Sequence, residues 1–549
     1  MRPQLRLKDL KEPQLPIKDA AQLLEVSTAS IRNWIKAGYF TRAGTGLISR
    51  ESFESFQNEV AGQEKLTARA NKSLKDTHDH RELQTRFHEL VQDGERNAAE
   101  LGCQYEAALS NAYRNKEGVY YTPPAIAERF FQYLPGDRDG NRSDLTFCDP
   151  CCGSGNFLLA AIEQGIDPAN LYGFDTDPVA IAMARKRIFE KTGYDSHKIQ
   201  YADFLEQSLQ PDQAGFDIIF TNPPWGKKIS KAEKQKYALH FGAGKCSDTS
   251  ALFFFACLAR LNQSGHLGFL LPDAFFNVAS FEDARQRALT REIKAFMDFG
   301  KPFQGLLTKA KGIVLQNCES SENTNIECEG PEQRRSRTQD SFRQNPKSIF
   351  NFTCSQEAAA VIEHLYEREH LTLADRAKYG LGIVTGNNKK FCRANSQAGY
   401  MPVYKGSDIQ KEKLKEPSTF IPDDLSLYQQ VAPVELFQAK EKLIYRFISS
   451  DLVFYHDTDQ TFFLNSVNML VLHDDFPISA KQLSQLLNSD VMNWLFRTIF
   501  ETHKVLRSDI EALPIHTQYF NQRTEFDEPS FLNYLGLEQT ANGTYRVKK

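Results

Sequence analysis

Four short apolar runs, each followed directly by polar residues, alternate with amphipathic stretches in the middle of the chain. The runs occupy residues 145–148, 171–174, 199–201 and 216–220, and the first amphipathic stretch is 158–162. This alternation predicts parallel strands and helices of an open α/β sheet. In such a sheet the carboxyl ends of the strands form the ligand-binding edge. We therefore expect the residues that follow the four runs to meet in one site.

The first run leads into a glycine-rich turn. Residues 149–155 read DPCCGSG, and glycines allow a ligand to approach the backbone closely. About 20 residues after Gly155 the second run ends at Asp175, the spacing at which a doubly wound fold places an acid on a ribose. The third run ends at Asp203 and Phe204, a carboxylate for an adenine amino group and a ring for its face. The turn lacks the six-residue dinucleotide fingerprint, which favours a nucleoside without a pyrophosphate.

The fourth run leads into Asn222-Pro223-Pro224-Trp225. An exocyclic amine on a nucleobase is a poor nucleophile because its lone pair is delocalised into the ring. The Asn222 side-chain oxygen and the Pro223 carbonyl can each accept one amine hydrogen, which favours a pyramidal nitrogen ready for methyl transfer. The prolines make the backbone rigid, and Trp225 offers a face on which an extruded base stacks with about 1 to 3 kcal/mol. The alternative is a proline-rich strand exit with a core tryptophan.

With these motifs in this order, the chain resembles the gamma-class adenine-N6 DNA methyltransferases, especially the Taq-type enzymes that carry a separate target-recognition domain. The resemblance covers roughly residues 116 to 515. Within it, residues 120–124 (YYTPP) look like the segment that closes over the methionine end of the cofactor. The resemblance implies a Rossmann-like, S-adenosylmethionine-dependent methyltransferase domain. The cofactor-binding residues that it implies are Tyr121, Thr122, Asp149, Cys151, Gly153, Gly155, Asp175, Thr176, Asp203, Phe204 and Asn222.

The resemblance also implies which residues hold the target adenine. These are Asn222, Pro223, Pro224, Trp225 and, as a second aromatic against the extruded base, Phe281. Phe281 follows the buried-strand pattern of residues 265–272. Phe275 and Phe276 are rivals for this role, and a place in the core is the alternative for all three.

Composition fits a cytoplasmic enzyme of several domains. The chain has 549 residues, 41% of them hydrophobic, and no apolar run approaches the roughly 18 to 20 residues that span a membrane. No secretory signal follows Met1, so the cysteines are expected to remain thiols. Cys148 and Cys151 have Cys-x-x-Cys spacing, but no second pair or nearby histidine completes a zinc site, and we expect no metal.

The formal net charge of -4 confines any DNA-binding surface to local patches. Residues 227–236 carry a lysine cluster directly after the strand-end tetrapeptide. We expect Lys227, Lys228 and Lys231 to contact phosphates beside the extruded nucleotide. A solvated loop is the alternative.

The N-terminal pattern predicts two short helices, residues 17–24 and 28–38, joined by a tight turn. With residues 47–50 as a wing strand, it resembles the small winged helix-turn-helix regulators whose second helix enters the major groove. Thr28, Arg32 and Asn33 are then candidates for DNA contact. A helical hairpin for subunit or domain contact is the alternative.

Shifts in composition divide the chain into five parts. We expect a winged helix-turn-helix domain at 1–56, a charged helical linker at 57–115, a methyltransferase domain at 116–370, an α+β target-recognition domain at 371–520 and a C-terminal tail at 521–549. The polar stretch 317–347 is expected to form an exposed, flexible insertion around a hairpin. In the target-recognition domain, Lys389 and Lys390 are candidates for contact with the DNA backbone.

The function predicted from these features is transfer of the S-adenosylmethionine methyl group to adenine N6 at a specific site in duplex DNA. The route is base flipping followed by direct displacement. The expected setting is the modification step of a restriction-modification or defence system, with double-stranded DNA and a separately encoded restriction endonuclease as candidate partners. The oligomeric state stays open. The alternatives are an N5-glutamine protein methyltransferase and an inactive methyltransferase fold that acts as a DNA-binding regulator.

Overall fold

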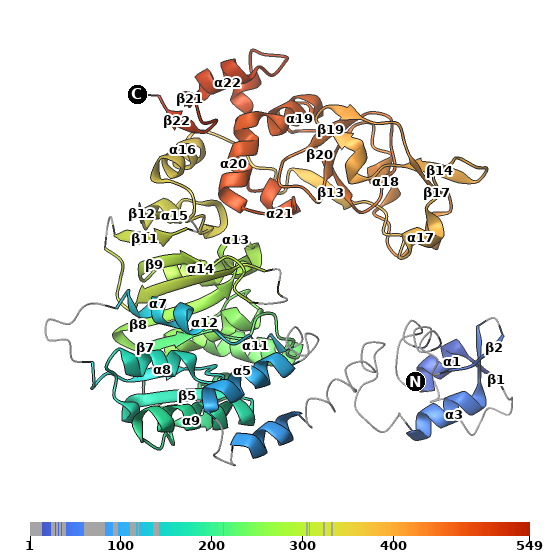
Figure 1. The fold of residues 1–549 in the computed structure, drawn as a ribbon. Helices are drawn as coiled ribbons and strands as arrows, with labels where there is room; N and C mark the ends of the chain where they lie inside the picture. The colour runs from blue at the N-terminus through green and yellow to red at the C-terminus, as the bar shows by residue number, and fades with distance from the viewer. Residues whose placement is uncertain are drawn as a thin grey trace.

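The computed structural model describes residues 14–23, 28, 31, 35, 40–44, 46–59, 83–91, 97–109, 117–118, 120–134, 142–211, 213–303, 306, 308–321, 324–330 and 333–548. These residues form an N-terminal body (14–59), a central body (83–353) and a C-terminal body (354–548), coloured from blue through green to red in Figure 1. None of the described helices is long and apolar enough to cross a membrane.

A nine-stranded sheet forms the middle of the central body. In spatial order its strands are β12 (Arg334–Thr338), β11 (Asn325–Glu329), β9 (Glu292–Asp298), β10 (Ala310–Gln316), β8 (Leu261–Pro272), β7 (Phe216–Thr221), β4 (Phe147–Asp149), β5 (Leu171–Asp175) and β6 (Ile199–Tyr201). Strands β6, β5, β4, β7 and β8 are parallel, as the alternating pattern predicts. Strand β10 pairs antiparallel with both β8 and β9. The parallel half therefore carries the crossover helices and the ligand-binding edge.

Helices cover both faces of the sheet because its strands direct apolar side chains to each side in turn. Ile218 and Phe220 of β7 belong to one core with α7 (Pro124–Phe131), α8 (Asn156–Glu163) and α9 (Pro178–Thr192). Ile219, between them, belongs to a second core with α12 (Thr249–Ala259) and α14 (Glu282–Leu289). Burial on both faces explains why the strands read as continuous apolar runs.

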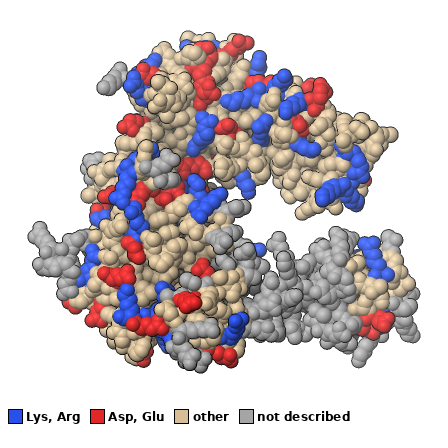
Figure 2. Space-filling model, viewed as in Figure 1, with Lys and Arg blue, Asp and Glu red and all other residues tan. Residues whose placement is uncertain are grey.

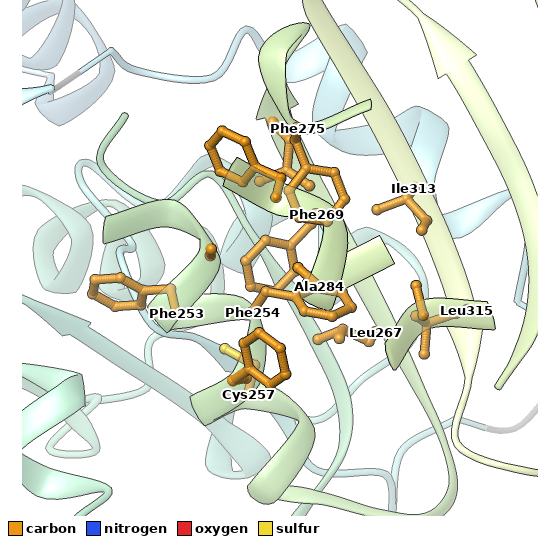
Figure 3. Packing of buried hydrophobic residues seen from close by; sticks show 14 of the residues in the cluster. Phe253, Phe254, Cys257, Leu267, Phe269, Phe275, Ala284, Ile313 and Leu315 are labelled. Carbon is orange, nitrogen blue, oxygen red and sulfur yellow. The ribbon is translucent and has the colours of Figure 1, made fainter. Parts of the chain in front are cut away.

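The second core is rich in phenylalanine (Figure 3). The ring of Phe254 on α12 lies 5.6 Å, between centroids, from the rings of both Phe269 on β8 and Phe275. Such aromatic pairs contribute about 0.5–1.5 kcal/mol each beyond the burial of their area. Phe275 belongs to α13 (Ala274–Asn277), which is followed by the 3₁₀ helix η3 (Ala279–Phe281). The cluster thus joins α12 to the segment that follows β8.

The polar stretch 317–347 contains the predicted hairpin, but its described residues are part of the folded edge of the sheet rather than a flexible insertion. Its described residues include the edge hairpin β11–β12, the helix α15 (Asp340–Arg343) and the 3₁₀ helix η4 (Pro346–Ser348). In β11, Ile326 and Cys328 are buried whereas Glu327 between them is exposed. Arg337 of β12 is 1% exposed and lies 4.0 Å above the ring of Phe342. Polar residues such as Glu327 lie on the exposed face of an edge strand, whereas Arg337 is buried against a partner. Amino-acid composition alone does not distinguish these cases from disorder.

The predicted linker is, in part, a layer of the central body. Residues 83–91 are helical, and α5 (Ala98–Ala108) follows. Phe87, Leu101 and Tyr105 are buried in one cluster with residues of α9. Leu101 and Tyr105 are four residues apart, the spacing that places both on one face of a helix. Charged residues on either side of this pair, among them Glu100 and Glu106, give the segment the composition of a linker.

The N-terminal body is a small mixed unit. Its described elements are β1 (Gln14–Pro16), α1 (Ile17–Leu23), β2 (Arg42–Gly44), β3 (Leu47–Ser49) and α3 (Arg50–Glu59), and its sheet has the order β1-β3-β2. Ile31 and Phe53 are fully buried in its core. Thr28 is helical and half-buried, whereas Arg32 and Asn33 lie outside the described residues. The helix-turn-helix therefore stays a prediction.

An antiparallel sheet forms the centre of the C-terminal body. Its strands are β13 (Ala377–Leu381), β20 (Val467–Leu472), β18 (Lys442–Arg446) and β19 (Phe454–Asp457), in that order. Its core includes the helices α16 (Gln356–Glu367), α19 (Ala480–Asn488), α20 (Asp490–Phe500) and α22 (Glu528–Leu535). Smaller elements are α17 (Asn388–Phe391), β14 (Tyr400–Val403), η5 (Gly406–Asp408), β15 (Ile409–Gln410), β16 (Lys413–Leu414), β17 (Thr419–Pro422), η6 (Leu425–Leu427), α18 (Val434–Phe437), α21 (Arg507–Ile510) and η7 (Thr517–Phe520).

Both predicted ends of the target-recognition domain differ from the structure. Val361 and Leu365 of α16 are buried in the core of the C-terminal body, so this body begins before residue 371. The predicted tail 521–549 supplies α22, β21 (Leu537–Gln539) and β22 (Tyr545–Val547), and Leu537 and Tyr545 are buried in the same core. The apolar positions of these segments indicate that they pack in a core, but they do not indicate in which one.

Buried polar contacts join the C-terminal body to the central body. Lys311 of β10 is 1% exposed, and its Nζ lies 2.7 Å from Asp273 Oδ1 and 3.0 Å from Glu501 Oε2. Asn277 Nδ2 donates a hydrogen bond of 2.9 Å to the carbonyl of Phe500. Because Asp273 directly follows β8, the C-terminal body is anchored beside the carboxyl ends of the parallel strands.

Candidate active site

A cavity opens at the carboxyl edge of the parallel half of the sheet. The predicted cofactor-binding residues that line it are Tyr121, Thr122, Asp149, Cys151, Gly153, Asp175, Thr176, Asp203, Phe204 and Asn222. Gly155 lies behind this lining as the N-cap of α8, with a left-handed φ of 90°. The structure thus brings the separated strand ends together at one cavity.

The glycine-rich turn holds the carboxylate of Asp175 from its own backbone. The Gly153 N–H donates to Asp175 Oδ2 over 2.9 Å, and the Asp177 N–H donates to Oδ1 over 2.9 Å. A Cβ on Gly153 would lie 2.7 Å from Cε1 of Tyr121, so a larger residue there would force the Tyr121 ring to move. Burial, reinforced by the charge of Asp177, raises the pKa of Asp175 to about 6. The carboxylate keeps acceptor capacity toward the cavity, which suits sugar hydroxyls.

Asp149 stabilises the site through hydrogen bonds within the chain. Thr221 Oγ1 donates to Asp149 Oδ1 over 2.7 Å, and the Cys151 N–H donates to the same oxygen over 3.1 Å. Asp149 is 1% exposed, and burial raises its pKa to about 7. The contacts fix the glycine-rich turn to the end of β7.

Asp203 and Phe204 line the same cavity. Asp203 Oδ1 caps α10 (Phe204–Gln207) by accepting from the Leu205 N–H over 2.9 Å. The ring of Phe204 is nearly parallel to that of Phe253, with centroids 6.3 Å apart and an interplanar angle of 15°. Both rings line the cavity, so an apolar wall stands beside a carboxylate.

Asn222 lies at the end of β7 with one half of its amide bonded and the other half free. Its Nδ2 donates to the carbonyl of Tyr120 over 2.8 Å. Its Oδ1 is buried and has no hydrogen-bond partner among the described residues. Pro223 is buried, and Pro224 lines the cavity next to Asn222. The tetrapeptide therefore presents an acceptor that needs a donor from a ligand.

Trp225 is half-buried and held in one orientation. Its Nε1 donates to the carbonyl of Leu270 over 3.3 Å. Its ring packs edge-on against Phe303 at 5.5 Å and beside Tyr120 at 6.4 Å, between centroids. Tyr120 itself lines the cavity. The indole is not among the residues that line the cavity and packs partly in the core, so its contact with an extruded base stays a prediction.

The structure does not bring Phe281 to the cavity, which corrects the prediction that it contacts the extruded base. Phe281 is 5% exposed and packs at 5.6 Å against Phe275 in the phenylalanine-rich core. Phe275 and Phe276, its rivals, are fully buried in the same core. An aromatic residue in a loop after a strand does not reveal from sequence which way it points.

The lysines after the tetrapeptide divide into two groups. Lys227 lines the cavity, and its Nζ lies 3.4 Å from Glu117 Oε2, so it is paired within the chain. Lys228 is exposed, as is Lys231, the first residue of α11 (Lys231–Phe241). A capping box of Ser230 and Glu233 begins this helix. Lys227 is therefore part of the cavity wall, whereas Lys228 and Lys231 stay candidates for phosphate contact.

Two residues that hold Asp177 at the cavity were not predicted from the sequence. Tyr105 of α5 donates through its hydroxyl to Asp177 Oδ2 over 2.8 Å, and Gln84 Nε2 donates to Asp177 Oδ1 over 3.1 Å. Asp177 also caps α9 by accepting from the Val179 N–H. The acidic pair at the end of β5 was visible in the sequence, but its partners lie far away in a segment read as a linker.

Basic residues of the C-terminal body gather away from the cavity. Lys389 and Lys390 are exposed on α17. Figure 2 shows Lys and Arg side chains at the tip of the C-terminal body where Figure 1 places α17. Lys390 Nζ lies 4.6 Å above the ring of Phe391. The tip thus offers a local positive patch on a chain of net negative charge.

Comparison with known proteins agrees with this architecture. The N-6 DNA Methylase family model matches residues 96–298, and the TaqI-like C-terminal specificity domain model matches residues 401–515. Type II methyltransferase M.VspI of Vibrio sp. (strain 343) is 51% identical over 399 residues, which is 72% of this chain and 96% of that protein.

Two solved structures share the fold over most of the chain. The type IIL restriction-modification enzyme MmeI, in complex with DNA, gives a TM-score of 0.51 at 12% identity, covering 75% of this chain and 70% of that one. A nuclease-deletion mutant of the type ISP restriction-modification enzyme LlaGI, in complex with a DNA substrate mimic, gives 0.51 at 11% identity, covering 90% and 62%. At these identities the likeness concerns the fold.

Fold and cavity define a Rossmann-like methyltransferase body joined to a separate specificity body. The chain belongs to the N-6 DNA methylase family and, with its TaqI-like C-terminal domain, is an adenine-specific type II DNA methyltransferase of the restriction-modification class. These similarities do not favour the protein-glutamine or inactive-regulator alternatives.

Proposed function

We propose that this methyltransferase holds the N6 amine of a target adenine, extruded from duplex DNA, against Asn222 and the Pro223 carbonyl. The observation that carries the proposal is the Asn222 amide. Its Nδ2 is bonded to Tyr120, whereas its buried Oδ1 has no partner among the described residues. A buried acceptor without a partner costs about 1–3 kcal/mol. An amine N–H supplies the missing donor.

The chemistry of the chain is to orient that amine. Hydrogen bonds from its two hydrogens to Asn222 Oδ1 and the Pro223 carbonyl favour a pyramidal nitrogen with a localised lone pair. The nitrogen would then form one new bond to the methyl carbon, the carbon–sulfur bond of the bound cofactor would break with its electron pair left on sulfur, and the nitrogen would release one proton to water. No covalent bond between the chain and the base is required. When bound, S-adenosylmethionine supplies the electrophilic methyl group.

The residues around the cavity fit S-adenosylmethionine. We assign the ribose hydroxyls to Asp175, the adenine amino group to Asp203 and the adenine ring face to Phe204. The hydrogen bonds from the Gly153 and Asp177 N–H groups support this assignment, because they hold the Asp175 carboxylate at the cavity. Thr122, 6% exposed at the cavity, is assigned to the methionine end.

Base extrusion is assigned to Trp225 without Phe281. The Trp225 ring is half-buried and already held by Leu270 and Phe303, so stacking a base on it requires little further ordering of the side chain. Such stacking contributes about 1–3 kcal/mol per base.

Recognition of DNA is assigned to local patches. Lys228, Lys231, Lys389 and Lys390 are proposed to contact phosphates, and the C-terminal body to read the bases. The N-terminal body is proposed as a further reader through Thr28, Arg32 and Asn33. A restriction endonuclease on a separate chain is the proposed functional partner.

Incubation with methyl-labelled S-adenosylmethionine and unmethylated genomic DNA, followed by digestion to nucleosides, tests the proposal. The expected labelled nucleoside is N6-methyldeoxyadenosine, and long-read sequencing should place it in one sequence motif. Label in N4-methyldeoxycytidine would contradict the assigned amine. Label in protein with none in DNA would restore the glutamine alternative.

A further inference from the structure

The catalytic loop is joined to the segment that closes the cavity by a short antiparallel series of contacts. Lys227 Nζ lies 3.4 Å from Glu117 Oε2, the Trp225 N–H donates to the Gly118 carbonyl over 3.3 Å, and Asn222 Nδ2 donates to the Tyr120 carbonyl over 2.8 Å. Residue numbers rise on one segment as they fall on the other. The two segments therefore lie against each other along their length.

Their approach is close enough to require glycine at one position. Gly118 has a φ of 69°, in the left-handed region. A Cβ built on Gly118 would lie 2.6 Å from both the N and the O of Trp225. Since these are backbone atoms, neither can turn aside as a flexible side chain would. A side chain at residue 118 must push the closing segment away from the catalytic loop.

The contact at Tyr120 determines which end of the Asn222 amide faces a ligand. A primary amide carries two donors on nitrogen and an acceptor on oxygen, at opposite sides of the same plane. With Nδ2 bonded to the Tyr120 carbonyl, Oδ1 is directed elsewhere, and it is the buried atom without a partner. The reversed amide would set oxygen against the Tyr120 carbonyl oxygen and direct donors at an amine that needs acceptors. The Tyr120 carbonyl therefore selects the productive orientation.

The closing segment is held from the cofactor side as well. Asn156 Nδ2 donates to the Thr122 carbonyl over 2.7 Å, and Arg187 Nη1 holds Asn156 Oδ1 over 2.8 Å. Tyr120, Tyr121 and Thr122 all line the cavity. One short stretch of backbone thus touches the glycine-rich turn, the cavity and the catalytic amide.

We propose that residues 117–118 and 120–122 form a positioning element for methyl transfer, whose Tyr120 carbonyl holds the catalytic amide with its oxygen toward the target amine. Because the same residues line the cavity, a bound cofactor tightens the series of contacts and sets Asn222 before DNA arrives. The inference rests on the proposed role of Asn222 as the acceptor for the amine. Tyr120 acts through Asn222 and does not touch the reacting atoms.

A pair of glycine variants tests the proposal. Gly118→Ala should lower kcat on the order of 100-fold, the effect of a displacement near 1 Å at a catalytic group, while cofactor affinity without DNA changes only a few fold. Gly242→Ala is the matched control, because Gly242, the C-cap of α11 outside the cavity lining, has a φ of 66° and nothing within 4 Å of a built Cβ. It should keep most of the wild-type kcat. Equal losses in both variants, or full kcat in Gly118→Ala, would overturn the proposal.

Hydrogen exchange on the wild-type protein gives a readout that does not depend on a variant folding. Pro223 and Pro224 have no N–H, so a peptide spanning 222–227 reports chiefly on the amides of Trp225 and its two successors. Adding S-adenosylhomocysteine without DNA should slow exchange in this peptide, because Trp225 N–H donates to Gly118. Unchanged exchange would refute the coupling to the cavity.

The two proposals fail differently. An active Asn222→Ala variant would remove the proposed function and this inference with it. If Asn222→Ala were inactive and Gly118→Ala fully active, the proposed function would stand. Only the role of the positioning element would then be removed.

Discussion

Asp457 of the C-terminal body and Asp175 of the central body are both hydrogen-bonded carboxylates, but they differ in what bonds to them. Asp457 is fully buried in the C-terminal body, where its Oδ2 lies 2.5 Å from Lys442 Nζ and accepts from Thr461 Oγ1 over 2.8 Å. Asp175 of the central body receives backbone N–H groups from Gly153 and Asp177 and borders the cavity. Asp457 is saturated by its own body, including a cation, whereas Asp175 keeps capacity for a ligand. Polar groups of the first kind hold the fold, and those of the second kind mark the site.

Breaking the saturated pair should give the largest effect on stability. Lys442→Met leaves the buried Asp457 without its cation, and removal of one partner of such a pair costs about 3–5 kcal/mol. Urea unfolding followed by circular dichroism measures the loss. The double variant Lys442→Met with Asp457→Leu should recover part of it. A loss below about 1 kcal/mol in the single variant would mean that the pair behaves like an exposed one.

Removing the charge of Asp175 at the cavity should lower cofactor affinity more than stability. Asp175→Asn should weaken S-adenosylmethionine binding by about 10- to 100-fold, since hydrogen bonds to charged groups contribute about 1.5–3 kcal/mol. The free energy of unfolding without cofactor should fall by no more than about 1–3 kcal/mol, because the lost acceptor for the Gly153 or Asp177 N–H is partly offset by removal of a carboxylate whose ionised form is disfavoured by burial. Calorimetric titration and urea unfolding measure the two quantities. A destabilised variant with normal cofactor affinity would place Asp175 with the structural aspartates.

The pH dependence of the same carboxylate sharpens the comparison. Burial raises the pKa of Asp175 from 3.8 to about 6. The folded pKa exceeds the unfolded one, so the folded state binds the extra proton, and this group lowers the free energy of unfolding as pH rises through that interval. Ribose hydroxyls favour the ionised carboxylate, so cofactor affinity should rise over the same interval and binding near pH 6 should release protons. Calorimetry in buffers of different ionisation enthalpy detects the release, and a flat affinity across this range would contradict the assignment.

The smallest expected effects separate the two candidate aromatics. Phe281→Leu should lower stability by about 1 kcal/mol, as for a core substitution of similar volume, and leave kcat unchanged. Trp225→Leu should weaken capture of the base by about 1–3 kcal/mol of stacking, seen as a lower kcat/KM on duplex DNA. If Phe281→Leu instead lowered kcat/KM with stability unchanged, the loop after α13 would have to move toward the cavity in the DNA complex.

The sequence predicted the parallel half of the sheet and its site well for a physical reason. Strands buried on both faces read as continuous apolar runs, and glycine, proline and acidic residues follow where their carboxyl ends meet. Asp175, Asp203 and Asn222 reach one cavity because the sheet order brings these strand ends together.

The remaining features depend on contacts that local patterns do not encode. Tyr105 reaches Asp177 from a segment whose charged residues made it resemble a linker. Arg337 is buried because Phe342 and neighbouring backbone surround it, although its surroundings in the sequence are polar. Phe281 packs in the phenylalanine-rich core and does not line the cavity. In each case contacts of the folded chain, which the local pattern of residues does not specify, decide the outcome.

The most direct test of the central claim compares wild type with Asn222→Ala in two measurements on the same preparations, kcat for DNA methylation and the Kd for S-adenosylmethionine. We predict that kcat falls on the order of 100- to 1000-fold, as for loss of one aligned hydrogen-bonding group in a transition state. The Kd should change by no more than about fivefold, the value of one net hydrogen bond. Retained turnover, or a loss explained entirely by weaker cofactor binding, would contradict the assignment of Asn222 as the acceptor for the adenine amine.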